Sequence, residues 1–264
     1  MPPAFFDHSL VDGVEWFKPT EYCRGPWDAN SCHAGPPSGL IARAVEQLVP
    51  HMQLVRLTVE LLRPVPMAGF CVQAQAVSAG RQVSRTSAQL VDRDGRVCAT
   101  ALALHMVSLE PRDIPTAPTR SPGGHPDNAA EGPFPIRMTL HGLPAINTSE
   151  SMDTRYPAGE DHSPGPTTIW MRTIALLGDE EPSGFQRICV LADSGNAIGR
   201  NSEPDEFSFV NPDLTLVLHR QPVGEWLGSQ AISDWHPDGI GLADALLFDV
   251  EGVVGRALQT LVVR

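Results

Sequence analysis

Two stretches of this sequence, LTVELLRP at residues 57–64 and LTLVLHR at residues 214–220, follow one pattern. Each begins as a short apolar run rich in leucine and valine, which is typical of a buried strand, and the first ends at a proline. Their first leucines lie 157 residues apart, and so do the glycines of two turn dipeptides at residues 94–95 and 251–252, each of which precedes another apolar run. Two anchors with one offset predict that the chain contains two copies of one unit.

Each copy has a predicted helix ahead of its strands. Residues 36–38, PPS, open a segment that ends at Pro50, and its apolar residues recur at helical spacing. In the second half, residues 181–183, EPS, open a segment that is apolar on most sides, and we expect it to close at Gly195-Asn196 in a left-handed cap. A short helix of this kind must be wrapped, and the strands that follow it are the candidate. The sequence therefore predicts an α+β fold, the double hotdog, in which two tandem units each wrap a central helix in a curved antiparallel sheet.

Residues 110–135 separate the two units. This run carries seven prolines and has almost no apolar periodicity, so it cannot form a core of its own. We expect an N-terminal hotdog unit at residues 1–109, a partly disordered linker at 110–135 and a C-terminal hotdog unit at 136–264.

The composition excludes several classes of function. A formal charge of −12 repels nucleic acid and anionic membrane surfaces. The sequence has no apolar stretch of about 20 residues and does not begin with a signal peptide pattern, so we expect a cytoplasmic protein without a membrane partner. The five cysteines are scattered and never form a CxxC pair, which argues against a disulfide framework or a structural zinc site. We expect neither a metal nor a bound cofactor.

Further motifs run through both halves: HAGPP at 33–37, LRP at 62–64, GRQVSR at 80–85, PDLTLVLHR at 212–220, GEWL at 224–227, PDGIGLA at 237–243 and GRALQTL at 255–261. In this order they resemble the thioesterase II group of double-hotdog acyl-CoA thioesterases. The resemblance covers nearly the whole chain apart from the linker. It implies a hydrolase acting on an acyl thioester of coenzyme A or of a carrier, with a medium-to-long or branched acyl chain between the central helices and the sheet.

The resemblance also implies the residues of a catalytic site. The aspartate of the family falls on Asp213 and its glutamine on Gln259. Its third member, a threonine or serine eight residues after the tryptophan of the GEWL motif, falls on Asp234, with Ser233 directly before it. The chain departs from the family at this position.

Thioester hydrolysis requires a positioned water, a proton acceptor and donors that face the developing oxyanion. We expect Asp213 to act as the base and Gln259 to orient the water. The oxyanion donors are expected at a helix start, either at Gly35 or near Ser183.

The departure at position 234 leaves two interpretations open. If Asp234 lies beside Asp213, two close carboxylates form an acid–base pair, which suits a hotdog dehydratase, hydratase or cyclase. Alternatively, Ser233 supplies the hydroxyl and Asp234 faces solvent, because adjacent strand residues point to opposite faces. A third possibility is a non-catalytic acyl-binding protein.

The candidate substrate-binding residues are His33, Gly35, Arg63 and Asn196. His33 either binds substrate, acts as a base or is an ordinary loop histidine, and Arg63 either meets coenzyme A phosphates or only keeps the surface soluble. The second predicted helix has two candidates for a side chain facing the pocket, Asp193 and Asn196. Long exposed sheet edges favour a homo-oligomer.

Overall fold

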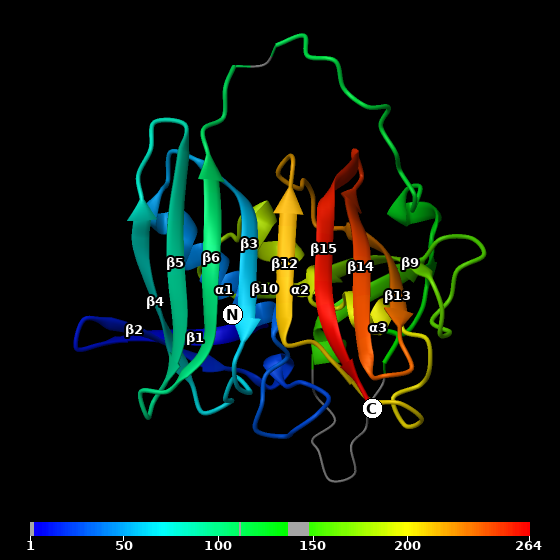
Figure 1. The fold of residues 1–264 in the computed structure, drawn as a ribbon, viewed down its shortest axis with the longest axis horizontal. Coiled ribbons are helices and arrows are strands. Elements are labelled where there is room, and N and C mark those ends of the chain that lie inside the picture. The colour runs from blue at the N-terminus through cyan, green and yellow to red at the C-terminus, as the bar shows by residue number, and fades with distance from the viewer. Residues whose placement is uncertain (1–2, 111, 137–147) are drawn as a thin grey trace.

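The computed structural model describes residues 3–110, 112–136 and 148–264. Within these residues, the strands form one 15-stranded sheet in front of two packed helices (Figure 1). The first half contributes β1 Ala4–Val11, β2 Val14–Pro19, α1 Gly35–Leu48, β3 Gln53–Leu61, β4 Phe70–Ser78, β5 Val83–Asp92 and β6 Val97–Met106. The second half contributes β8 Met152–Tyr156, β9 Thr167–Thr173, β10 Ala175–Leu177, α2 Gly184–Ala192, α3 Gly195–Ile198, β11 Phe209–Val210, β12 Asp213–Leu218, β13 Leu227–Trp235, β14 Ile240–Asp249 and β15 Gly252–Val263.

The centre of the sheet is the antiparallel pair of β3 and β12. Their registers place Thr58 opposite Thr215, with the two hydroxyl oxygens 3.3 Å apart. These residues are separated by the predicted offset of 157, so the two copies meet at equivalent positions. The strand order β4-β5-β6-β3 on one side mirrors β13-β14-β15-β12 on the other. The predicted duplication is thus visible as an approximate twofold relation across this strand pair.

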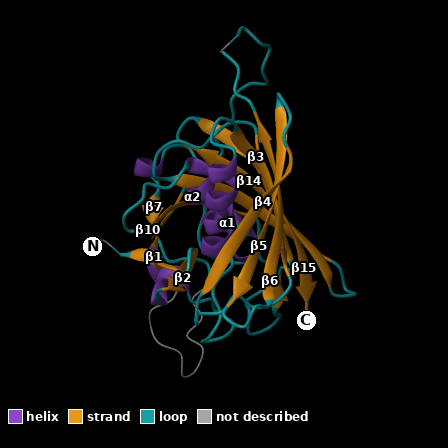
Figure 2. Cartoon of the chain, turned by 90° about the vertical axis from the view of Figure 1, so that its left-hand side faces the viewer, coloured by secondary structure: helices purple, strands orange, loops and turns teal. Residues whose placement is uncertain are grey.

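The helices lie on the concave side of the curved sheet (Figure 2). Helix α1 occupies the predicted segment and has prolines in its first turn, where the missing N–H groups cost no helical bond. Helix α2 begins after Ser183, whose hydroxyl accepts a hydrogen bond from the N–H of Gln186 at 3.1 Å. Both helices bury most of their side chains in one apolar core. The sheet therefore wraps a helix pair, as predicted for a double hotdog.

The expected left-handed cap at Gly195-Asn196 is wrong. Asp193, in the right-handed region, ends α2. The N–H groups of Ala197 and Ile198 bond back to the carbonyl of Ser194, which starts the short helix α3. Gly195 and Asn196 are helical because these bonds continue the right-handed path of the chain.

Part of the expected linker joins the sheet. Residues Pro126–Asn128 form a 3₁₀ helix, and β7 Ala130–Glu131 pairs with β8. Earlier in the same segment, the carbonyl of Gly123 accepts a hydrogen bond from the buried indole of Trp170 at 2.9 Å. Two further 3₁₀ turns lie at Glu21–Cys23 and Thr148–Ser151. Among the described helices, none has the length and apolar character needed to cross a bilayer.

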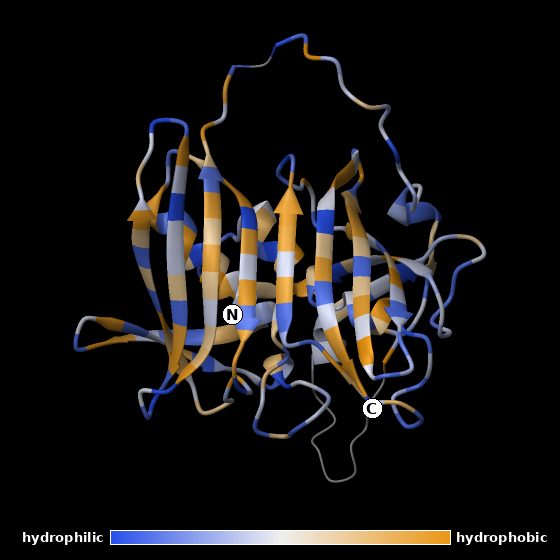
Figure 3. Cartoon of the chain, in the orientation of Figure 1, coloured by the Kyte–Doolittle hydropathy of each residue, from blue (hydrophilic) through white to orange (hydrophobic). Residues whose placement is uncertain are grey.

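Apolar and polar residues alternate along the central strands, as the alternating colours in Figure 3 show. In β12, Leu214, Leu216 and Leu218 are buried against the helices. Asp213 and Thr215 therefore lie on the outer face. This alternation decides which polar side chains reach the interior.

Candidate active site

Gln259 is a buried amide on the inner face of β15. Its Nε2 donates to the backbone carbonyl of Asp193 at 3.0 Å and approaches the carboxylate oxygen Oδ1 of the same residue at 3.3 Å. Its Oε1 accepts a hydrogen bond from the N–H of Asn196 at 2.9 Å. A Cβ atom at Gly195 would lie 3.1 Å from this oxygen, so the glycine permits the close approach. Gln259 thus joins the last strand to the end of α2 and the start of α3.

Asp193 provides the carboxylate of this cluster, and its side chain is only 3% exposed. Its Oδ1 accepts from Nδ2 of Asn211 at 2.9 Å, and its Oδ2 lies 3.2 Å from Nδ1 of His33. The peptide N–H of Gly35 donates to Nδ1 of His33 at 3.2 Å. Burial raises the pKa of Asp193, although these neighbours and Gln259 favour its charged form. The carboxylate is therefore desolvated but surrounded by donors.

Asn211 lies between β11 and β12, and both ends of its amide are bonded. Besides Asp193, its Nδ2 donates to the backbone carbonyl of Asp213 at 3.1 Å. Its Oδ1 accepts from Nδ2 of Asn196 at 3.2 Å. Asn211 was not predicted as a site residue, because an Asn-Pro dipeptide before a strand has the signature of a turn.

His33 reaches Asp193 because the start of α1 packs tightly against α2. A Cβ atom at Gly35 would come within 2.9 Å of the Cα of Val190, so only glycine allows this approach without a shift. The N–H of His33 donates to the carbonyl of Cys23 at 2.7 Å, which fixes the backbone just before the helix. The imidazole is 16% exposed. One half of the chain therefore supplies the ring and the other half supplies the carboxylate.

Of these residues, His33, Asp193, Asn196 and Asn211 line a cavity of about 430 Å³. Its apolar wall includes Trp27, Phe134, Ile136, Phe209 and Val262. The rings of Trp27 and Phe209 meet edge to face, with centroids 6.2 Å apart. An apolar cavity with a few converging polar groups is the usual form of a site for a small organic ligand.

The structure does not bring Asp213 to Gln259. The Asp213 side chain lies on the outer face of β12, where Oδ1 accepts from the N–H of Thr260 at 2.7 Å. Gln259 faces the helices and is 1% exposed. The expected convergence of these two residues fails because strand alternation directs their side chains to opposite faces.

Asp234 does not pair with Asp213. Strands β15 and β14 separate β12 from β13, and Thr260, Leu242 and Asp234 follow one another across the registers. Three strand spacings correspond to about 14 Å, which is too far for a shared proton. Asp234 is exposed, as the second interpretation expected.

Ser233 is buried on the inner face of β13. Ala243 of β14 lies between it and Gln259 in the registers. Its hydroxyl has no hydrogen-bond partner among the described residues. The expectation that this hydroxyl completes a site with Asp213 and Gln259 is therefore not met.

The candidate binding residues lie around the cavity. His33, Asn196 and Arg63 line it, and the N–H of Gly35 is directed at His33. Arg63 is exposed and donates to the carbonyl of Val97 at 2.9 Å.

Neither helix start that was expected to hold the oxyanion donors presents them to the cavity. The N–H of Gly35 is occupied by Nδ1 of His33. Ser183 lies at the other helix start, where its hydroxyl contacts Glu46 at 3.0 Å.

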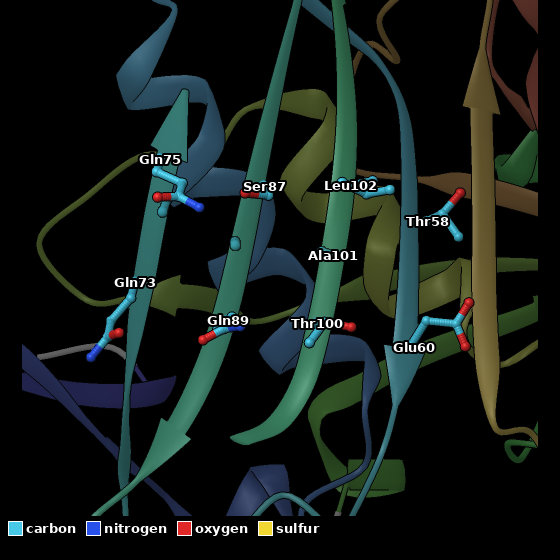
Figure 4. A pocket seen from close by; sticks show the side chains of 11 residues that line it. Thr58, Glu60, Gln73, Gln75, Ser87, Gln89, Thr100, Ala101 and Leu102 are labelled. Atoms are coloured by element: carbon cyan, nitrogen blue, oxygen red, sulfur yellow. The ribbon is translucent and has the colours of Figure 1, made fainter. Parts of the chain in front are cut away.

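A second hollow of about 390 Å³ lies on the outer face of the first half (Figure 4). Gln73, Gln75, Gln89 and Thr100 project there from neighbouring strands. None of the residues predicted for the site lies in it. Within the described residues, no group of three or more His, Cys, Asp or Glu side chains is arranged to hold a metal ion.

The comparisons with known proteins agree with this architecture. The acyl-CoA thioesterase N-terminal domain matches residues 23–106, and the acyl-CoA thioesterase C-terminal domain matches residues 118–263. No curated protein matches the sequence.

Among solved structures, a putative thioesterase from Novosphingobium aromaticivorans is similar in fold, with a TM-score of 0.74, 17% identity and coverage of 99% of this chain and 98% of that one. A putative thioesterase II from Thermobifida fusca has a TM-score of 0.71, 13% identity and coverage of 97% and 96%. An acyl-CoA thioesterase II from Mycobacterium marinum has a TM-score of 0.65, 16% identity and coverage of 98% and 96%. The double-hotdog fold and the resemblance drawn from the motifs are confirmed.

Proposed function

Because this chain belongs to the acyl-CoA thioesterase family, we propose that it hydrolyses an acyl thioester of coenzyme A or of a carrier in the cavity between its two halves. The observation that supports this site is the buried Asp193 carboxylate on the wall of a mostly apolar cavity, hydrogen-bonded to Asn211 and Gln259 and 3.2 Å from His33. The proposed site therefore uses the carboxylate of Asp193 instead of that of Asp213.

The proposed reaction follows from this division of the cavity. The acyl chain lies against the apolar wall, with its thioester carbonyl at the polar end. A water there gives up its proton to the Asp193–His33 pair as its oxygen attacks the carbonyl carbon. Gln259 and Asn211 hold the Asp193 carboxylate in one orientation, so little free energy is needed to orient it during the reaction.

Free thiol release from a panel of acyl-CoA substrates tests this assignment. We expect Asp193→Asn to lower kcat by about 10²–10⁴-fold, the range attributed to a positioned acid or base. Asp213→Asn is the matched control, because it makes the same change 20 positions later on the outer face. Its rate should stay within about threefold of the wild type, since surface changes have small effects. The reverse ranking of the two variants would restore Asp213 and refute the proposed site.

We also propose a cellular location, an assembly state and unit boundaries for the enzyme. We propose that it acts in the cytoplasm as a homo-oligomer, with units at 1–109 and 136–264 joined by residues 110–135. Exposed apolar side chains on the outer face of the sheet, such as Leu102, Val217 and Leu242, support self-association. Light scattering that gives the mass of a single chain at micromolar concentration would contradict the oligomer.

A further inference from the structure

We infer that the side chain of Asn196 donates a hydrogen bond to the oxyanion that forms during the proposed hydrolysis. This role rests on the proposed function, because an oxyanion forms in the cavity only if a thioester is cleaved there. The donor atom is Nδ2 of Asn196. The hydrogen bonds around this amide fix its orientation, and Asn196 lines the cavity.

The amide of Asn211 has only one possible orientation. Its Nδ2 lies 2.9 Å from Oδ1 of Asp193 and 3.1 Å from the backbone carbonyl oxygen of Asp213. A carbonyl oxygen only accepts hydrogen bonds, so the amide must present its nitrogen there and its oxygen on the other side. That oxygen lies 3.2 Å from Nδ2 of Asn196. Because the Asn211 oxygen is itself an acceptor, Asn196 must meet it with its NH₂ group.

The NH₂ group of Asn196 has one more hydrogen than Asn211 uses. An amide nitrogen carries two N–H donors, and Oδ1 of Asn211 accepts from one of them. No other described residue accepts a hydrogen bond from this nitrogen. Asn196 is 7% exposed, and a buried N–H without an acceptor costs about 1–3 kcal/mol. The acceptor for the second N–H must therefore come from the cavity that Asn196 lines.

Two hydroxyl groups on the cavity wall are bonded elsewhere. The hydroxyl of Ser31 donates to the carboxylate of Asp28 at 2.9 Å, and that of Thr148 donates to the backbone carbonyl of Arg24 at 2.8 Å. Each hydroxyl has a single hydrogen to donate. The amide of Asn196 thus offers the cavity a donor that these hydroxyls do not.

Asn196 is also suitably placed relative to Asp193. Oδ1 of Asp193 and Nδ2 of Asn196 contact the nitrogen and the oxygen of the same Asn211 amide. A thioester carbonyl carbon can therefore lie between a water at Asp193 and a carbonyl oxygen at Asn196. The backbone N–H of Asn196 donates to Oε1 of Gln259 at 2.9 Å, which holds the donor in place before the reaction begins.

The chemistry needs no transfer of a proton from Asn196. As the water oxygen bonds to the carbonyl carbon, the π electron pair of the C=O bond moves onto the carbonyl oxygen, and the N–H of Asn196 donates to this oxygen. When the C=O bond re-forms, the C–S bond breaks and its electron pair leaves with sulfur. The proton taken from water passes to the thiolate. The nearby Asp193 carboxylate makes a second negative charge costly, so a donor directed at that charge has a large effect.

The first test compares Asn196→Ala with the wild type in thiol release. We expect kcat to fall by about 10²–10³-fold with little change in KM, the loss that follows removal of one oxyanion donor. Asn201→Ala is the matched control, because Asn201 is exposed and lies outside the cavity. Its rate should stay within about threefold of the wild type.

A second test separates oxyanion binding from support of Asn211. It measures the affinity of two analogues of coenzyme A: a trifluoromethyl ketone, which forms a tetrahedral oxyanion, and a thioether, which has no carbonyl oxygen. Asn196→Ala should weaken binding of the ketone by about the factor lost in kcat/KM and leave binding of the thioether unchanged. Asn196→Leu, which has nearly the shape of asparagine without its N–H groups, should behave in the same way and covers a folding defect in the alanine variant.

Two results would overturn the role of Asn196 and leave hydrolysis at Asp193 standing. One is a loss of kcat below tenfold in both Asn196 variants. The other is an equal loss of affinity for the ketone and the thioether, which would assign Asn196 to the structure of the site alone. A wild type that releases no thiol from any substrate overturns both proposals.

Discussion

At both ends of the α1–α2 helix pair, the start of one helix meets a carboxylate near the end of the other. The two ends differ in whether that carboxylate can reach a ligand. At one end, the start of α1 places His33 against Asp193 at the end of α2. At the other, the start of α2 places Ser183 and Gln186 against Glu46 near the end of α1, at 3.0 and 2.7 Å. The first end opens into the cavity. The second is closed, because a Cβ atom at Gly184 would lie 2.4 Å from the carbonyl oxygen of Pro222. A duplicated fold supplies two helix-end carboxylates, and the packing around each one decides which can meet a ligand.

The sheet shows the same contrast at Gln259. Thr215 faces Leu258 in the second half as Thr58 faces Leu102 in the first, so the counterpart of Gln259 is Ala103. Their separation is 156 residues, one less than the offset of the preceding strands. The difference arises at the hairpin, because four residues separate Asp92 from Val97 whereas three separate Asp249 from Val253. The first half thus carries a methyl group where the second carries an amide.

The extra hairpin residue also changes an ion pair. In the second half, Arg220 forms two hydrogen bonds with Asp249, at 2.5 and 2.6 Å. In the first half, Asp92 bonds instead to Arg96. Arg63, which corresponds to Arg220, consequently has no acidic partner among the described residues and stands at the rim of the cavity.

Among the changes that test this contrast between the halves, the largest effect should come from the inner position of the last strands. We expect Gln259→Ala to lower kcat/KM by about 10–100-fold and to cost about 1–3 kcal/mol of stability, since it leaves buried partners unbonded. The matched variant Ala103→Gln should cost about 1–3 kcal/mol by overpacking the core, without loss of kcat. Thiol release and urea denaturation measure both effects. Equal loss of activity in the two variants would contradict a site confined to one end of the helix pair.

The second-largest effect should come from Asp249 and its counterpart Asp92, the carboxylates at the two hairpins. Burial alone would raise the pKa of Asp249, but Arg220 and the N–H groups of Val223 and Glu251 outweigh it and lower that pKa. Stability from this carboxylate is therefore present above the ordinary pKa of an aspartate and is lost as pH falls through the lowered value. We expect Asp249→Asn to cost about 3 kcal/mol near neutral pH, because it breaks a buried pair.

Asp92→Asn is the control for that prediction. Its partner Arg96 is 61% exposed, so the loss should be smaller. Urea denaturation at several pH values measures the difference, and an equal loss in the two variants would mean that burial does not distinguish the hairpins.

A third prediction concerns the closed end of the helix pair. Burial raises the pKa of Glu46, against the opposing hydrogen bonds from Gln186 and Ser183. The native state therefore holds this proton more tightly than the unfolded chain does, and stability falls as pH rises from the ordinary glutamate range toward the raised pKa. Glu46→Gln should flatten that decline and leave kcat within about threefold, as expected for a residue away from the site. Thermal denaturation across pH provides the measurement, and a large loss of kcat would show that both ends take part in turnover.

The smallest effect should come from Arg63. If it meets the phosphates of coenzyme A, Arg63→Gln should raise KM for acyl-CoA about two- to fivefold, the value of an exposed charge contact. KM for the matching acyl-pantetheine, which lacks the nucleotide, should not change. An equal rise for both substrates would assign Arg63 to the shape of the rim instead of to the carrier.

The sequence predicted more of the fold than of the candidate site. Apolar periodicity and a repeated offset can be read from one sequence, and they were enough to predict the strands β3, β6, β12 and β15, the helix α1 and the duplication. Gln259 was found through its motif and does face the interior. Asp213 was misplaced because the pattern of a motif does not reveal which face of the strand its first residue occupies.

Asn211 was not predicted at all, and Asp193 was predicted only as a candidate for a side chain facing the pocket. Asp193 directly follows an apolar helix and Asn211 lies in an ordinary turn signature, so neither differs locally from a residue with a structural role. Their importance arises from contact between segments that are distant in the chain, and a single sequence does not display such contacts.

The close packing of Gly35 on Val190 has a consequence for how the molecule must be built. The His33 imidazole and the Asp193 carboxylate belong to different halves of the chain. They come into contact only when the two halves pack in one specific arrangement. Covalent fusion keeps the effective concentration of one half around the other high and independent of dilution. Two separate copies of the unit would have to find the same geometry by association, and identical copies would place the same residues at both helix ends. When the two halves are joined in one chain and differ in sequence, one end of the helix pair can be reactive while the other end only holds the two halves together.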